Sequence, residues 1–124
     1  MSDTSYKTIK LGFVAEGLFE DKKSRFIAQL CNVETESEAQ EFLATVRAKH
    51  YNARHNVPAW ILEDGTERAS DDGEPSRTAG MPVLEVLRGA ELKNVCCVVT
   101  RYFGGTLLGP GGLVRAYTAE TQEA

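Results

Sequence analysis

Three carboxylates lie close together in the middle of the chain, in a polar segment without hydrophobic periodicity. Asp71, Asp72 and Glu74 fall within four residues, and Arg77 and Thr78 follow them. Carboxylates at this spacing can act as general bases, bind a cation or accept hydrogen bonds from backbone N–H groups. Composition alone favours a solvated acidic loop. We therefore take these five residues as candidates for binding rather than for catalysis.

A glycine-rich segment later in the chain is the second candidate site. It follows an apolar run at residues 95–99 and precedes a helical pattern that begins at Leu113. Strand, loop and helix in this order offer several backbone N–H groups to an anion. The segment lacks the Lys-Ser/Thr end of a P-loop and does not fit G-x-G-x-x-G, so a purely structural role for its glycines is an equal alternative. The candidate residues are Arg101, Tyr102, Gly104, Gly105, Gly111, Gly112 and Arg115.

The sequence contains no recognisable catalytic or metal-binding set. Ser76 has no histidine near it in sequence. His50 and His55 are five residues apart, a spacing that does not place two side chains on one face of a helix. The three cysteines form no C-x-x-C pair and are expected as buried thiols. We predict no catalytic residues, no cofactor and no metal.

Length and composition indicate one globular domain. The 124 residues are 42% apolar and 26% charged, which is ordinary for a soluble protein. No apolar run approaches the length of a membrane span, and the first ten residues are polar, so we expect a cytoplasmic protein without membrane contact. The net charge of −4 opposes a general electrostatic grip on nucleic acid. The alternative of a local basic groove, built from arginines near the predicted loops, is not excluded by the net charge.

Hydrophobic patterning predicts an α+β fold after a disordered tail at residues 1–5. Residues 16–23 are expected as a hairpin connection, and a helix is expected to begin at a Thr35 or Ser37 cap. A mostly four-stranded sheet would carry its helices on one face, as a two-layer sandwich whose other face needs cover or binds a partner. Strands are expected at residues 6–15, 25–33, 57–62 and 95–99, helices at about 35–49, 82–89 and from 113 onward, and a long loop at 67–82.

Two long motifs in this order resemble the signature of the Impact/YigZ family. They are DDGEPSRTAGMPVL at residues 71–84 and NVCCVVTRYFGGTLLGPGGLVRAY at residues 94–117. SRFIA at 24–28 and KHYNARH at 49–55 also match, so the resemblance runs from about residue 7 to the end. It implies a fold like the second domain of ribosomal protein S5. Residues 6–124 would then be the family's N-terminal domain, without the ferredoxin-like domain that usually follows it.

The resemblance implies a non-enzymatic regulatory module of translation. Eukaryotic relatives bind an activator of a stress-responsive kinase, and nucleic-acid binding has been suggested for the bacterial branch from its fold. The partner would be a protein of the translation machinery or RNA, and the oligomeric state is not implied.

Two further interpretations stay open. One is an enzyme that acts on a phosphorylated small molecule or nucleotide through the glycine-rich loop. The other is a structural role, in which Asp72 and Glu74 accept hydrogen bonds from amides of that loop. Arg77 stands where the family usually has glycine, and Leu107 and Pro110 stand where it has lysine and threonine, which weakens an anion site in the loop.

Overall fold

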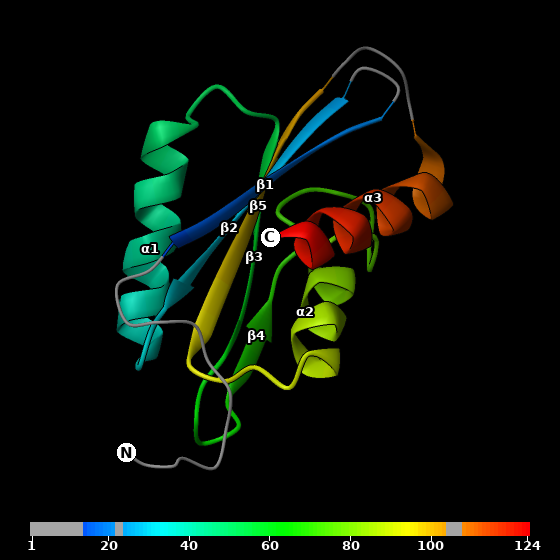
Figure 1. The fold of residues 1–124 in the computed structure, drawn as a ribbon. Helices are drawn as coiled ribbons and strands as arrows, with labels where there is room; N and C mark the ends of the chain where they lie inside the picture. The colour runs from blue at the N-terminus through cyan, green and yellow to red at the C-terminus, as the bar shows by residue number, and fades with distance from the viewer. Residues whose placement is uncertain (1–13, 22–23, 104–107) are drawn as a thin grey trace.

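The computed structural model describes residues 14–21, 24–103 and 108–124, and for residues 14–21 it describes the backbone alone. Strands and helices alternate irregularly along the chain (Figure 1). The elements are β1 (Val14–Asp21), β2 (Ser24–Asn32), α1 (Glu36–Lys49), β3 (His55–Ile61), β4 (Glu67–Ala69), α2 (Gly80–Gly89), β5 (Val95–Tyr102) and α3 (Gly109–Glu123).

The strands form one sheet in the order β1-β2-β5-β3-β4, and every neighbouring pair is antiparallel. β5 lies in the middle, hydrogen-bonded to β2 on one side and β3 on the other. Four of the strands have seven or more residues, and β4 adds a three-residue edge. The predicted α+β class and its four main strands are therefore confirmed, and β4 falls inside the segment that we expected as a loop.

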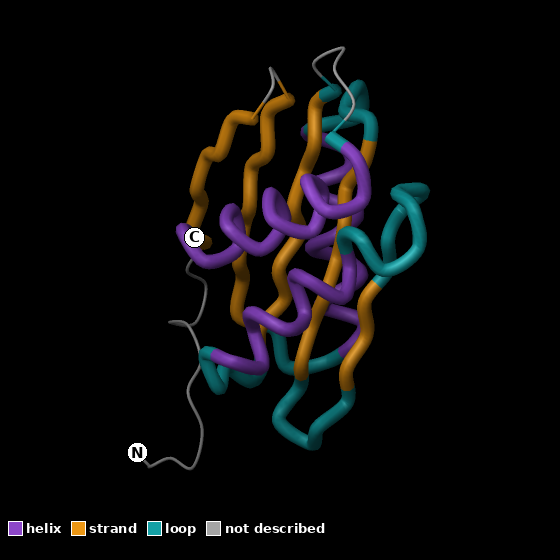
Figure 2. Tube along the Cα trace, turned by 90° about the vertical axis from the view of Figure 1, so that its right-hand side faces the viewer, coloured by secondary structure: helices purple, strands orange, loops and turns teal. Residues whose placement is uncertain are grey.

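Helices cover both faces of the sheet, so the expected two-layer arrangement is wrong. Figures 1 and 2 show α2 and α3 together on one face, and Figure 1 shows α1 on the other. Alternate residues of β5 divide between two hydrophobic clusters: Cys97 packs beneath α2 and α3, and Cys96 packs with Ala39 and Val46 of α1. The physical reason is visible in β5 itself, because a continuous apolar run has two faces to remove from water.

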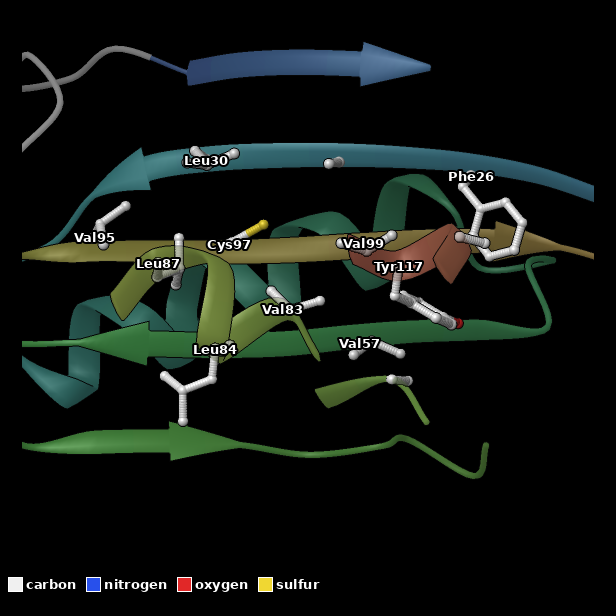
Figure 3. Packing of buried hydrophobic residues seen from close by; sticks show 14 of the residues in the cluster. Phe26, Leu30, Val57, Val83, Leu84, Leu87, Val95, Cys97, Val99 and Tyr117 are labelled. Atoms are coloured by element: carbon white, nitrogen blue, oxygen red, sulfur yellow. The ribbon is translucent and has the colours of Figure 1, made fainter. Parts of the chain in front are cut away.

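The larger core lies between the sheet and the pair α2–α3 (Figure 3). Phe26 of β2 meets Tyr117 of α3 edge to face, with ring centroids 5.2 Å apart. Val83 and Leu87 of α2 are buried beside them, at most 1% exposed. Burial of apolar side chains is the dominant favourable term in folding, so this larger cluster is a major source of stability.

The hairpin at the start of the chain is longer than expected. β1 pairs with β2 from Val14 opposite Cys31 to Asp21 opposite Ser24, so strand pairing continues through residues 16–21, where a connection was expected. Regular pairing with β2 overrides the local signal of Gly17 and the neighbouring charges. The expected tail at residues 1–5 and the rest of the first predicted strand lie outside the described residues.

The start of α1 confirms the predicted cap at Thr35. The backbone N–H of Glu38 donates to Thr35 Oγ1 at 3.1 Å. Glu38 Oε1 in turn accepts from the N–H of Glu34 at 2.7 Å, a reciprocal arrangement close to a capping box.

Candidate functional site

The acidic motif and β5 meet in a buried ionic cluster, the Glu74 cluster, made of Glu74, Arg101, Tyr117 and His55. Arg101 Nη1 donates to both carboxylate oxygens of Glu74 at 2.9 Å, and Tyr117 Oη donates to Oε2 at 2.5 Å. His55 Nε2 lies 3.4 Å from Oε1. The side chains of Glu74 and Arg101 are only 2% and 6% exposed, so this ion pair is held inside the protein.

Four separate segments position the cluster. Arg101 lies near the end of β5, directly opposite His55 at the start of β3. Tyr117 extends from α3 toward the same place, and Glu74 is supplied by the loop between β4 and α2. Burial, followed by the charge of Glu74, raises the pKa of Tyr117 well above its ordinary value, so its hydroxyl remains a donor.

Asp71 organises the start of α2. Its Oδ1 accepts from the backbone N–H groups of Ala79 at 3.2 Å and Gly80 at 2.9 Å, and its Oδ2 accepts from that of Arg77 at 2.9 Å. Backbone N–H groups at a helix start have no partner within the helix, so a carboxylate stabilises them. Gly80 is required by packing, because a Cβ there would lie 2.6 Å from the carbonyl oxygen of Ser70.

Asp72 joins the motif to β3 and α1. Its Oδ2 accepts from the N–H of Asn56 at 2.7 Å, and its Oδ1 accepts from Arg47 Nη2 at 3.0 Å. His55 Nδ1 donates to the carbonyl oxygen of Asp72 at 2.7 Å, since a carbonyl can only accept. The donors to Asp72 and Glu74 that the structure describes come from α1, β3, β5 and α3. Residues 104–107 of the glycine-rich loop lie outside the described residues, so hydrogen bonds from its amides stay a prediction.

The remaining candidates that the structure describes make no hydrogen bond or ion pair with the Glu74 cluster. Thr78 is buried and donates to the carbonyl oxygen of Pro75 at 2.6 Å. Arg77 is exposed with a φ of 64°, a left-handed conformation that glycine adopts at low cost. Arg115 is exposed on α3. Gly111 and Gly112 lie in the first turn of α3, and Gly104 and Gly105 lie outside the described residues.

Two arginine–aromatic pairs lie at one end of the sheet, where β5 ends. We call it the rim and define it as Arg25, Arg54, Tyr102 and Phe103. Figure 1 shows β5 ending there beside the start of β2. The guanidinium carbon of Arg54 lies 4.5 Å from the centroid of Phe103, and that of Arg25 lies 5.5 Å from the centroid of Tyr102. Both arginines are exposed and make no ion pair with any side chain that the structure describes.

The rim continues inward to the Glu74 cluster through stacked side chains. Arg101 lies between Phe103, at 5.5 Å, and the buried ring of Phe26, at 5.8 Å, and Arg54 covers Phe103 from outside. Arg101 Nε is buried and has no hydrogen-bond partner in the described part of the chain. Guanidinium groups and aromatic rings therefore alternate from the core to the surface, and each cation is held in place by ring contacts.

The described residues offer little for catalysis. Burial raises the pKa of Cys97 to about 12 and that of Cys96 further, so both thiols stay protonated. Among the residues that the structure describes, no three His, Cys, Asp or Glu side chains gather closely enough to hold a metal ion. The carboxylates of the acidic motif are engaged by internal donors instead.

The sequence-based candidates did not include Tyr117 and His55 of the cluster or Arg25 and Phe103 of the rim. Arg54 was considered only as one of several arginines near the predicted loops. A local signal existed for His55 and Arg54, which both lie in the KHYNARH segment. No pattern in the sequence shows that these segments converge, because β2, β3 and β5 become neighbours only in the sheet.

Comparison with known proteins agrees with this architecture. A family model described as the Impact N-terminal domain matches residues 22–124. The chain is 51% identical over 121 residues to the IMPACT family member YvyE of Bacillus subtilis, covering 96% of this chain and 55% of that protein. It is 45% identical over 109 residues to the family member YigZ of Escherichia coli, covering 85% and 53%. The chain thus spans about half the length of these relatives.

Two solved structures resemble the chain. One, titled a hypothetical protein, superposes with a TM-score of 0.88 at 41% identity and covers 92% of this chain and 57% of that one. The other, the two-domain translational regulator Yih1, has a TM-score of 0.56 at 25% identity and covers 99% and 50%. No helix in the described part of this chain is long and apolar enough to cross a membrane. With the family model matching most of its length, the chain belongs to the Impact family and contains the N-terminal domain of that family.

Proposed function

We propose that this chain is a non-enzymatic module that binds a component of the translation machinery, with the rim as its contact surface. One observation carries the proposal. The carboxylates of the acidic motif are engaged by donors within the fold, whereas Arg25 and Arg54 are exposed and have no ion-pair partner among the side chains that the structure describes. Arginine and tyrosine, which occur at the rim, are among the residue types that dominate binding energy at interfaces. A related protein is titled a translational regulator, which agrees with this role.

The alternative of a phosphoryl-handling enzyme has less support. Asp71, Asp72 and Glu74 would have to act as base or metal ligand, yet each already accepts two or more internal contacts. A base that is fully engaged with arginine and backbone donors is poorly placed to take a proton from a substrate.

Ribosome co-sedimentation tests the proposal. The tagged chain is centrifuged from a cell lysate through sucrose, and its share in the ribosomal fractions is measured for wild type and for Arg25→Gln with Arg54→Gln. We expect the double variant to leave those fractions.

The matched control is Arg68→Gln with Lys93→Gln, which removes the same charge. Lys93 lies just before β5, at the end of the sheet away from the rim, and Arg68 lies on edge strand β4. Equal sedimentation of all three proteins, whether bound or unbound, would overturn the proposal.

A further inference from the structure

A groove lies between α2 and α3, the two helices that Figures 1 and 2 show together on one face of the sheet. We call it the α2–α3 groove. Its volume is about 830 Å³, and most of the residues that line it are apolar. One of them is Val114, which is 38% exposed and is one of two exposed large hydrophobic residues in the described part of the chain. Exposed apolar surface rimmed by charges marks a place where another molecule packs.

The α2–α3 groove also holds one cation and one anion that are not paired with each other. Arg77 and Glu85 both line it, and the Arg77 guanidinium makes no ion pair with any side chain that the structure describes. The side chain of Glu85 is 66% exposed and lies 3.9 Å from Arg88, whose closer contact is with Glu67 at 2.6 Å. Both groove charges are therefore available to a partner.

These charges belong to a row of residues that is symmetric about Met81. Met81, Glu85 and Gly89 are spaced four residues apart on α2, so they follow one ridge of the helix, and all three line the groove. Arg77 precedes Met81 by the same four residues, just before the helix begins. When a second α2 runs antiparallel to the first about a two-fold axis at Met81, Arg77 of each copy faces Glu85 of the other. Both charges of both copies are then paired.

A second copy of the chain suits this groove better than another occupant. A small apolar carboxylate or an acidic peptide would pair with Arg77, but it would cover Glu85 without giving that carboxylate a cation, which is costly. A Cβ at Gly89 would meet nothing within 4 Å, so there is room for a neighbouring helix to approach. Met81 is flexible enough to pack against its own copy at the axis.

We infer that this chain forms a two-fold symmetric dimer through the α2–α3 groove, with reciprocal Arg77–Glu85 ion pairs on either side of Met81. In such a dimer the same surface serves both copies, so every favourable contact occurs twice. The inference goes beyond the proposed function and does not depend on it, since the rim residues Arg25 and Arg54 do not line the groove.

Sedimentation velocity of the whole chain at concentrations from roughly 1 µM to 1 mM tests the dimer. We expect wild type to pass from monomer to dimer within this range. Arg77→Glu and Glu85→Arg should each raise the dissociation constant by about 100-fold, because either variant places like charges together on both sides of the axis. Arg115→Glu makes the same charge change at an exposed residue of α3 outside the groove, and it should dimerise as wild type does.

Mixing the two single variants separates a lost contact from a fault in folding. In a dimer of one Arg77→Glu chain and one Glu85→Arg chain, opposite charges again face each other on both sides of the axis. The mixture should therefore dimerise at concentrations where neither variant does so alone. A mixture that stays monomeric overturns the inference, and so does a wild type that stays monomeric up to about 1 mM. Dimerisation that is unchanged by both charge reversals would place the contact on another surface and would overturn it as well.

Discussion

At the scale of single residues, Glu74 is the most connected side chain of the two motifs. One carboxylate accepts from Arg101 and Tyr117 and faces His55, at 2% side-chain exposure. A buried ion pair adds little net stability when intact, because both charges had to leave water, but losing one partner leaves the other charge buried and unpaired. Glu74 therefore serves mainly to fix the relative positions of α3, β5 and the acidic loop.

We expect Glu74→Ala to lower the free energy of unfolding by about 3–5 kcal/mol. Urea denaturation followed by tryptophan fluorescence measures it. Glu67→Ala is the control, since Glu67 pairs with Arg88 on the surface, where such pairs contribute under about 1 kcal/mol. Glu74→Ala combined with Arg101→Met should recover part of the loss, because no charge is then left unpaired. An equal loss of unfolding free energy in Glu74→Ala and Glu67→Ala would contradict a stabilising role for the buried Glu74 carboxylate.

The sequence singled out several of the residues that hold these segments together, but it did not predict their structural roles. Asp71, Asp72, Glu74 and Arg101 were singled out from the sequence as able to do chemistry. In a loop, however, no periodicity tells which way a side chain points, so composition favoured a solvated acidic segment. Inward direction depends on partners such as Tyr117, which is 43 residues away from Glu74 in the chain.

At the scale of elements, β5 is the strand that the sequence described best. In the structure its unbroken apolar run is covered on both faces, with Cys96 beneath α1 and Cys97 beneath α2 and α3. The expected placement of all helices on one face does not fit this arrangement. The buried side of α1 is small, chiefly Ala39 and Val46, so its pattern could not show which face it covers. The length of β1 was missed because pairing with β2 decided it.

Because Cys97 is buried, we expect the free energy of unfolding to fall as the pH rises above 9. Its pKa rises from an ordinary 9.0 to about 12, chiefly because desolvation disfavours the thiolate. Above pH 9 the unfolded chain loses this proton while the folded chain keeps it. Stability from this group is thus complete below pH 9 and is lost as pH rises toward 12, at about 1.4 kcal/mol per pH unit.

The prediction is checked by urea unfolding of wild type and Cys97→Ala under reducing conditions at pH 8 and pH 10. The variant lacks a packed thiol and is less stable at pH 8, but it also lacks this titration. The difference in free energy of unfolding between wild type and Cys97→Ala should therefore be about 1 kcal/mol smaller at pH 10 than at pH 8. A difference that is the same at both pH values would show that the Cys97 thiol titrates normally in the folded protein.

At the scale of the whole molecule, protection from solvent is greatest at the centre of the sheet. β5 is paired on both sides, and its residues from Val95 to Arg101 are at most 5% exposed, whereas β4 is a three-residue edge. We expect β5 amides to exchange with deuterium only through global unfolding and β4 amides to exchange much earlier. Exchange measured by NMR in low urea checks this. Early exchange in β5 would contradict a sheet that opens from its edges.

The central place of β5 also has a consequence for synthesis of the chain on the ribosome. β2 and β3 are made first, but they become neighbours only through a strand that begins at Val95. Until about 100 residues have left the exit tunnel, one edge of the β1–β2 hairpin and one edge of β3 have no partner. Nascent edges of this kind invite pairing with other chains, so the order of the strands leaves this domain open to misassociation until β5 is complete.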